Sequence, residues 1–273
     1  MDLIVFDLDG TLLDRHSSLS AGTRETLGLL ASQGIAYTVA TGRTLHAARA
    51  LLEGCEFKLP HIYKNGVMIW RPDTQRYSHS NLLAMHEIRN VVEGFIAQGV
   101  TPFIFTVEPQ DHYGVYHLPL QTAAEHRLAA HFAAIDGLHV SPVSQLPFAA
   151  DITNISALGP QLAVKYIQQL ISAEPHLVAY SGAAIEGEQL QWIDIHHSEA
   201  SKGGAIAEIG KDLGVSRVIC FGDSDNDLSM FALADECYAP SNAKDSVKAV
   251  ATAVIGHHDE DGIAEFLRKR FNL

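Results

Sequence analysis

Short apolar runs recur along the chain and alternate with longer amphipathic stretches. The apolar runs at residues 3–6, 35–40 and 217–221 are bounded by turn residues or charges, which is typical of buried strands. The stretches at residues 23–32 and 45–52 follow the first two runs and predict helices. Strands and helices that alternate in this way form a parallel sheet covered by helices, so the pattern predicts an α/β fold.

The middle of the chain has a different pattern. An amphipathic helix is predicted from about residue 82, and it is followed by strands and helices without a regular alternation: strands at 103–107, 113–117, 152–157, 178–180 and 190–195, and helices at 123–135 and 162–171. This mixture predicts a second sheet with helices on one face. The alternation returns from Lys202 onward, so residues 1–81 and 190–273 are expected to form one discontinuous domain with an α/β domain, residues 82–189, inserted into it.

Two aspartates, Asp7 and Asp9, stand where the first apolar run ends, before Gly10. Residues two apart on a strand point to the same side, so both carboxylates are predicted to share one site at the edge of the sheet where ligands bind. Like charges that close repel each other unless a divalent metal or a shared proton joins them. A pair of solvated turn aspartates is the alternative, and these two residues alone leave both interpretations open.

A second acidic segment follows another apolar run. Residues 217–221 lead into Gly222-Asp223-Ser224-Asp225-Asn226-Asp227, which places three carboxylates and an amide at a strand tip. Oxygen ligands of this kind suit magnesium. The EF-hand pattern requires glycine at its sixth position and glutamate at its twelfth. No register that starts at Asp223 or Asp225 supplies both, so a calcium-sensing loop is excluded.

Two further segments supply hydroxyl, amide and cationic groups. Residues 35–40 lead into Thr41-Gly42-Arg43, and Ser201-Lys202 precedes a helical pattern at residues 205–213. Ser201 is a predicted N-cap, which puts Lys202 in the first turn of that helix. A lysine beside a helix N-terminus attracts anions such as phosphate. For Lys202 alone, an ordinary exposed lysine is the favoured alternative.

Taken together, these segments resemble the signature motifs of the haloacid dehalogenase-like phosphatase superfamily, in the order that this superfamily shows. The nucleophile, hydroxyl, lysine and acidic motifs match Asp7-Leu8-Asp9-Gly10-Thr11, Thr41-Gly42-Arg43, Ser201-Lys202-Gly203 and Gly222-Asp223-Ser224-Asp225-Asn226-Asp227. Lys64-Asn65-Gly66-Val67 resembles a segment of the Cof-type branch, whose members carry an α/β cap of type IIB. The resemblance covers essentially the whole chain and implies a Rossmann-like, three-layer core with an inserted cap domain.

The resemblance also implies roles for individual residues. Asp7 is expected to be the nucleophile that forms an aspartyl-phosphate, and Asp9 to protonate the leaving alcohol and later accept a proton from water. Thr41 and Lys202 are expected to hold and neutralise the phosphoryl oxygens. Gly42, Arg43 and Asn226 are expected to contact the substrate. A Mg²⁺ site is expected from Asp7, Asp223 and the backbone carbonyl of Asp9, with Asp227 orienting the ligands. Asp225 is expected to face solvent.

The function that these roles imply is a magnesium-dependent phosphatase acting on a small phosphorylated metabolite, a sugar phosphate or similar compound. A phosphotransferase or phosphomutase stays open because it shares the aspartyl-phosphate, and a non-catalytic metabolite-binding protein is a third alternative. Polar residues in the middle of the chain are candidates for contacts to the leaving group, although solvated surface positions are the favoured interpretation for each: His112, Tyr113, His117, Arg127, His196 and His197.

Composition limits the partners and the compartment. The chain has 273 residues, 47% of them hydrophobic, which is enough for a sizeable core. Its net charge of −13 argues against nucleic acid and anionic membranes as partners. With no apolar leader, no run of membrane-spanning length and three cysteines outside any CxxC pair, a cytoplasmic protein is expected, as a monomer or simple homodimer. The segment at residues 257–261, His-His-Asp-Glu-Asp, is predicted to be an acidic helix start and not a metal site.

Overall fold

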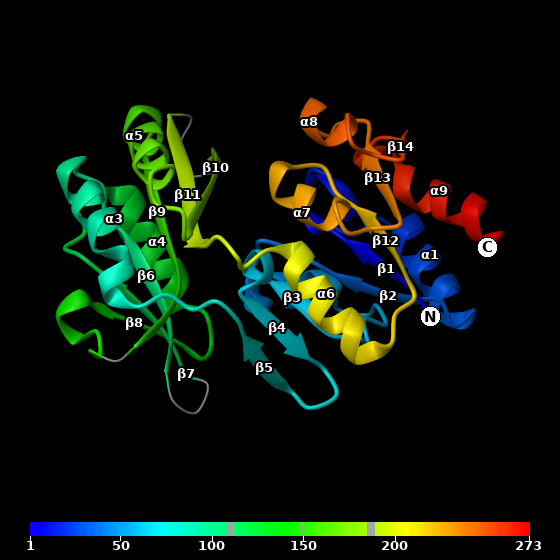
Figure 1. Cartoon of the computed structure of the whole chain (residues 1–273), viewed down its shortest axis with the longest axis horizontal. Helices are drawn as coiled ribbons and strands as arrows, with labels where there is room; N and C mark the ends of the chain where they lie inside the picture. The colour runs from blue at the N-terminus through cyan, green and yellow to red at the C-terminus, as the bar shows by residue number, and fades with distance from the viewer. Residues whose placement is uncertain (109–111, 149, 185–188) are drawn as a thin grey trace. The chain divides into compact units, whose positions relative to one another are not determined.

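The computed structural model describes residues 1–108, 112–148, 150–184 and 189–273 (Figure 1). The chain divides into two compact units, one made of Met1–Ser80 with Ala200–Leu273 and the other of Asn81–Glu199. Each unit has a sheet and a hydrophobic core of its own. The α/β fold class predicted from the sequence is confirmed. Among the described residues, no helix combines the length and the apolar character needed to cross a membrane.

A parallel five-stranded sheet forms the centre of the first unit, in the order β14-β13-β12-β1-β2. Its strands are β1 (Asp2–Phe6), β2 (Ala36–Val39), β12 (Arg217–Phe221), β13 (Glu236–Pro240) and β14 (Ala253–Ile255). The side chains from Leu3 to Phe6 are fully buried. Burial on both faces explains why β1 reads as a continuous apolar run and not as an alternation.

Helices cover both faces of this sheet. The helices of the first unit are α1 (Ala21–Ser32), α2 (Leu45–Leu52), α6 (Lys202–Leu213), α7 (Leu228–Phe231), α8 (Asp245–Lys248) and α9 (Gly262–Phe271). On one face, Ile206 of α6 and Met230 of α7 belong to the same core cluster as Val5. On the other face, Phe266 of α9 lies 5.8 Å from Phe221, measured between ring centroids, and α9 lies beside α1 (Figure 1). The arrangement is a three-layer core.

A small antiparallel sheet in the same unit was not predicted. It consists of β3 (His61–Tyr63), β4 (Met68–Arg71) and β5 (Arg76–His79), in that order. Each strand has only three or four residues, so none of them carries an alternation long enough to recognise. The bridge between Ala40 and Ile62 places β3 parallel to the end of β2. The βαβ rhythm through α2 therefore continues into this small sheet.

The second unit contains a six-stranded sheet in the order β10-β11-β9-β6-β7-β8. Its elements are α3 (Met85–Ala97), β6 (Phe103–Glu108), β7 (His112–His117), α4 (Ala123–Ala133), β8 (Leu138–Pro142), β9 (Asp151–Pro160), α5 (Gln161–Ile171), β10 (Leu177–Ala183) and β11 (Leu190–His197). Neighbouring strands are antiparallel except for β7 and β8, which are parallel and are joined through α4.

The helices of this unit pack on both faces of its sheet, so the expectation of helices on one face is wrong. Ile104 of β6 shares a core cluster with residues of α3 and α5. Its neighbours Phe103 and Phe105 point to the opposite face, where both rings contact Phe132 of α4. The crossover from β7 to β8 carries α4 to that face, and periodicity along a single helix gives no information about which face it covers.

The end of the inserted segment also differs from the expected boundary between residues 189 and 190. The strand β11 begins at Leu190 and belongs to the second unit, because it pairs antiparallel with both β9 and β10. The return to the first unit comes only at Ala200. An apolar strand pattern identifies a strand but not the sheet that it joins.

Candidate active site

Asp7 lies at the tip of β1, in the parallel sheet of the first unit. Its backbone amide donates to the carbonyl of Phe221 over 2.9 Å, which extends the pairing of β1 with β12 by one residue. Its carboxylate is buried, with 5% of the residue exposed, and Oδ1 lies 2.5 Å from Nζ of Lys202. Burial raises the pKa of Asp7 well above its usual value, against the opposing effect of Lys202 and with help from Asp227 and Asp223.

Lys202 is the first residue of α6 and is fully buried, so the alternative of an ordinary exposed lysine is wrong. The predicted N-cap is confirmed, because Oγ of Ser201 accepts from the amide of Gly204 over 3.0 Å. Nζ of Lys202 lies 2.5 Å from Asp7 and 2.6 Å from Oδ1 of Asp227. Burial alone would lower the pKa of Lys202, but the carboxylates of Asp227 and Asp7 raise it, so the side chain stays protonated.

The turn after β12 supplies the other two carboxylates. Asp227 is fully buried, and its Oδ2 accepts from the amides of Asp223 and Ser224 over 2.8 and 2.9 Å. These bonds fold the turn back on itself and aim Oδ1 at Lys202. Asp223 accepts from the hydroxyl of Thr11 over 3.2 Å. Burial, followed by the charge of Asp227, raises the pKa of Asp223.

The acidic groups fit a divalent cation. Asp7, Asp223 and Asp227 each offer one carboxylate oxygen, and these oxygens all lie within 4.8 Å of one another. When ionised, the three carboxylates outnumber the single ammonium of Lys202, so the group then carries an excess of negative charge. Oxygen donors that carry this excess suit Mg²⁺, which takes few protein carboxylates and keeps several waters.

Asp9 does not share a side of the strand with Asp7, contrary to the strand-based prediction. The strand β1 ends at Phe6, and the chain turns through Leu8–Leu12, where Gly10 has a φ of +74°. The side chain of Asp9 is 53% exposed and forms a two-point pair with Arg43, whose Nε and one terminal nitrogen lie 2.7 and 2.5 Å from its oxygens. The rule that residues two apart share a side failed because it was applied beyond the end of the strand, which stops at Phe6.

The hydroxyl segment, Thr41-Gly42-Arg43, lies beside the turn that contains Asn65, to which the sequence assigned no role in the site. Oγ1 of Thr41, itself buried, accepts from the amide of Arg43 over 3.1 Å. The amide of Asn65 donates to the carbonyl of Thr41 over 3.0 Å, and Oδ1 of Asn65 accepts from Nδ2 of Asn226 over 2.9 Å. A Cβ on Gly42 would lie 3.2 Å from the same Oδ1. Asn65 thus connects the hydroxyl segment to the acidic turn.

The conformation of this turn explains its composition. Lys64, Asn65 and Gly66 all have positive φ, at +47°, +54° and +108°. A Cβ on Gly66 would lie 2.2 Å from the carbonyl oxygen of Ser201, so only glycine fits beside the start of α6. Non-glycine residues with positive φ cluster at functional sites because the surroundings must hold them in that conformation. The Asn-Gly pair was the available signal, but it did not assign a role to Asn65.

The remaining candidates fall into two groups. Asp225 is exposed and pairs with Lys244 over 2.7 Å, so the prediction of a solvent-facing residue is confirmed. In the second unit, His196 is fully buried, which contradicts a surface position. His112 and Tyr113 line a cavity of about 410 Å³. His117 and His197 are half-buried, and Arg127 is exposed.

A family model for haloacid dehalogenase-like hydrolases matches residues 4–267, a span that contains every element of the site. The chain belongs to this family. The predicted Cof-type branch is confirmed with it, and so is the expectation of an enzyme. The match runs through the second unit as well as the first, as expected for a core with an inserted α/β domain.

Relatives of similar length match over nearly the whole chain. A 5-amino-6-(5-phospho-D-ribitylamino)uracil phosphatase of Bacillus subtilis is 26% identical over 278 residues, with 99% of this chain and 98% of the relative covered. A pyridoxal phosphate phosphatase of Escherichia coli is 23% identical over 275 residues, with 97% of each chain covered.

Solved structures share the fold of this hydrolase. A haloacid dehalogenase-like hydrolase from Bacteroides thetaiotaomicron superposes with a TM-score of 0.75 at 22% identity, over 99% of both chains. The structure of a subclass IIB sugar phosphatase of the superfamily gives a TM-score of 0.74 at 20% identity, over 100% of this chain and 99% of the other. At this level of identity the likeness establishes the fold.

Proposed function

We propose that this hydrolase is a magnesium-dependent phosphatase that cleaves a small phosphorylated metabolite through an aspartyl-phosphate. The observation that carries the proposal is the group formed by Asp7, Lys202, Asp223 and Asp227, in which three carboxylates stand against a single ammonium. A buried carboxylate fixed beside one ammonium is a nucleophile held in place, and the excess charge suits a divalent cation.

Asp7 acts as the nucleophile in the first step. We assign the attack to its Oδ2, because Oδ1 is engaged by Lys202. The bond from this oxygen to phosphorus forms as the bond from phosphorus to the leaving oxygen breaks. Lys202 keeps the carboxylate in position and offsets the negative charge of the phosphoryl oxygens. Asp227 holds Lys202 from the opposite side over 2.6 Å.

Asp9 moves the protons. In the first step its carboxylic acid gives a proton to the leaving oxygen; in the second it takes a proton from the water that attacks phosphorus and frees Asp7. The two-point pair with Arg43 holds the carboxyl group of Asp9 in place before substrate binds. Exposure of this pair supports the role, because the side chain must reach both an alcohol and a water.

Substrate and cation contacts complete the proposal. We assign phosphoryl contacts to Thr41, Gly42, Arg43 and Asn226, and cation contacts to Asp7, the carbonyl of Asp9, and Asp223, with Asp227 orienting them. When bound, Mg²⁺ would neutralise charge on the phosphoryl group. The amide pair of Asn65 and Asn226 supports this assignment, since it fixes the Asn226 side chain beside the hydroxyl segment.

The second unit is proposed to act as a cap that selects the leaving group. The two relatives described above are named for phosphate esters of a ribitylaminouracil and of pyridoxal, both small polar molecules. We therefore propose a sugar phosphate or a similar polar metabolite as the substrate. We also propose the cytoplasm as the location.

Phosphate release across a panel of phosphorylated metabolites tests this function. The assay compares wild type with Asp7→Asn, each with Mg²⁺ and with EDTA. We expect release by the wild type only, and only with Mg²⁺, and the ranking of the panel identifies the substrate class. Adding sugar acceptors separates hydrolysis from transfer, because a transferase passes the phosphoryl group to the acceptor. Equal release by Asp7→Asn would reject the proposed mechanism.

A further inference from the structure

The segment at residues 257–261 runs along the loop that follows Asp7. Nδ1 of His258 lies 2.7 Å from the carbonyl oxygen of Leu13, and because a carbonyl only accepts, Nδ1 carries the hydrogen. The carboxylate of Asp259 accepts from the backbone amide of Arg15 over 2.6 Å and pairs with Nε of Arg15 over 2.8 Å. An acidic helix start alone does not account for these bonds to a distant segment.

Asn242 connects the same segment to the turn at Gly10. Its Nδ2 donates to the carbonyl oxygen of Gly10 over 2.7 Å, and its Oδ1 accepts from the backbone amide of His258 over 3.2 Å. Both ends of the amide are therefore used, and they join two loops that lie far apart in the sequence. The loop after Asp7 is thus held at Gly10, Leu13 and Arg15.

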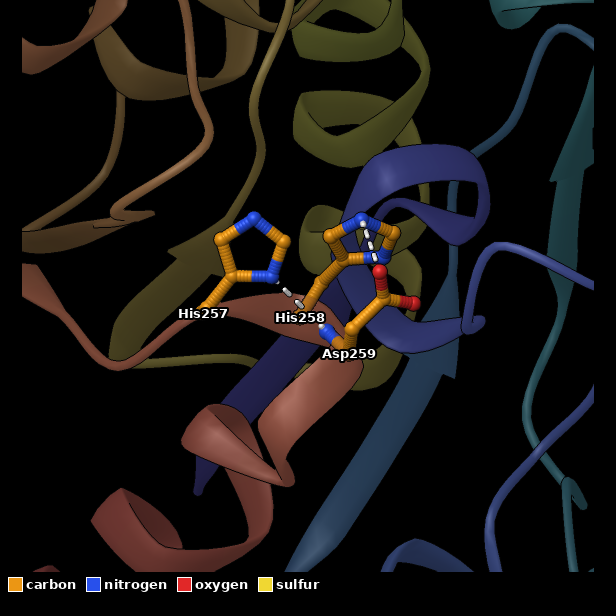
Figure 2. A group of neighbouring side chains, drawn as sticks. All are labelled: His257, His258 and Asp259. Atoms are coloured by element: carbon orange, nitrogen blue, oxygen red, sulfur yellow. Dashed lines mark hydrogen bonds and ion pairs between the residues drawn. The ribbon is translucent and has the colours of Figure 1, made fainter.

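The histidines of this segment do not form a good metal site, although His257, His258 and Asp259 lie close together (Figure 2). Nδ1 of His257 accepts from the amide of Asp259 over 3.2 Å, so its lone pair is already in use. Both oxygens of Asp259 are engaged by Arg15. A cation bound here would have to break these bonds.

The loop after Asp7, which these bonds hold, contacts the carboxylate of Asp223. A Cβ on Gly10 would lie 2.6 Å from Oδ2 of Asp223, so the loop packs directly on this carboxylate. Thr11 donates to the other oxygen of Asp223 over 3.2 Å. A shift of the loop would therefore change the surroundings of one of the candidate cation ligands.

We propose that His258 and Asn242 are positioning residues for the active site. They hold the loop after Asp7 against Asp223, so that the cation site has its working geometry before the cation binds. The proposal rests on the proposed magnesium-dependent phosphatase activity. It assigns to the segment 257–261 a role in the reaction that does not involve contact with substrate.

Two substitutions of His258 separate the role of Nδ1 from that of Nε2. Asparagine places an amide nitrogen close to the position of Nδ1 and keeps a donor for Leu13, whereas glutamine places its amide close to the position of Nε2 and loses that donor. His257→Ala is the matched control, because among the described residues the side chain of His257 bonds only to the amide of Asp259, in its own segment. Asn242→Asp is a second variant that keeps the acceptor for His258 and replaces the donor to Gly10 with an acceptor.

The experiment measures hydrolysis of p-nitrophenyl phosphate against Mg²⁺ concentration, at temperatures below the unfolding transition of each variant. For His258→Gln and Asn242→Asp we expect the half-activating Mg²⁺ concentration to rise by about tenfold and kcat to fall, with KM for the ester near that of wild type. His258→Asn and His257→Ala are expected to stay within about twofold of wild type. A loss of general stability alone would not change the Mg²⁺ dependence in this selective way.

Hydrogen exchange of the amides at residues 8–15, measured without Mg²⁺, is the readout that does not depend on activity. We expect faster exchange in His258→Gln than in His258→Asn. Equal effects of glutamine and asparagine in both measurements, or a loss in His257→Ala as large as in His258→Gln, would overturn the proposal. If the wild type releases no phosphate at all, the proposed function fails, and the exchange comparison still decides whether His258 holds the loop.

Discussion

Two charged groups stand beside the first strand, and they are built in opposite ways. The group of Asp7, Lys202 and Asp227 is buried, and Asp227 is fixed by further bonds from the backbone amides of the turn after β12. The pair of Asp9 and Arg43 is partly exposed, with 53% and 24% of the two side chains accessible. Groups that must stay in place are buried, and the group that must exchange protons with alcohol and water is left in contact with solvent.

The largest effect is expected from breaking the buried group. Lys202→Met removes the ammonium that offsets the carboxylates of Asp7 and Asp227 and leaves both charges buried. We expect the free energy of unfolding, measured in urea without Mg²⁺, to fall by about 3–5 kcal/mol, together with the loss of phosphatase activity. A variant as stable as wild type would show that the buried ion pairs do not hold the site together.

A change at Asp223, the half-buried carboxylate beside the buried group, should weaken the cation site. For Asp223→Asn we expect the half-activating Mg²⁺ concentration to rise by at least about tenfold, because one charged ligand is lost. Asp225→Asn is the matched control, since Asp225 lies in the same turn but is exposed and paired with Lys244. Equal Mg²⁺ dependence of the two variants would remove Asp223 from the site.

A smaller effect concerns the pH dependence of the metal-free protein. Burial and the charge of Asp227 raise the pKa of Asp223 above its ordinary 3.8, so the folded protein holds this proton more tightly than the unfolded chain. Ionisation of Asp223 therefore removes stability as the pH rises through the raised pKa. We expect the Tm of Asp223→Asn relative to wild type, measured without Mg²⁺, to increase from about pH 4 to about pH 7. A difference that is flat over this range would contradict the raised pKa.

The smallest change is expected at the exposed pair. Arg43→Gln should alter the free energy of unfolding by less than about 1 kcal/mol, because ion pairs in contact with solvent contribute little. The KM for substrate should nevertheless rise, since Arg43 is a proposed phosphoryl contact. A loss of stability comparable to that of Lys202→Met would remove the contrast between the two groups.

The sequence predicted the buried group well because its members follow ends of regular elements. Asp7 comes directly after β1, and Asp223 follows β12 after Gly222. These strands are neighbours in a parallel sheet, and Lys202 begins the helix that packs on it. Carboxyl ends of parallel strands meet at one edge, so residues far apart in the chain could be brought together without knowledge of the coordinates.

What the sequence did not predict depends on turns and on long-range bonds. The direction of Asp9 is set by the turn through Leu8–Leu12, and the role of Asn65 by a turn between two very short strands. The bonds from Asn242 and His258 to the loop after Asp7 join loops more than 200 residues apart. Periodicity describes helices and strands, and it carries no information about contacts of this kind.

Trapping of the phosphorylated enzyme tests the central claim most directly. The wild type is mixed with its best substrate and Mg²⁺, quenched in acid within milliseconds, digested, and sequenced by tandem mass spectrometry. We expect one added phosphoryl group on Asp7, present during turnover and absent in Asp7→Asn. Phosphate release without any adduct on Asp7, or with the adduct on another residue, would contradict the assignment of Asp7 as the nucleophile.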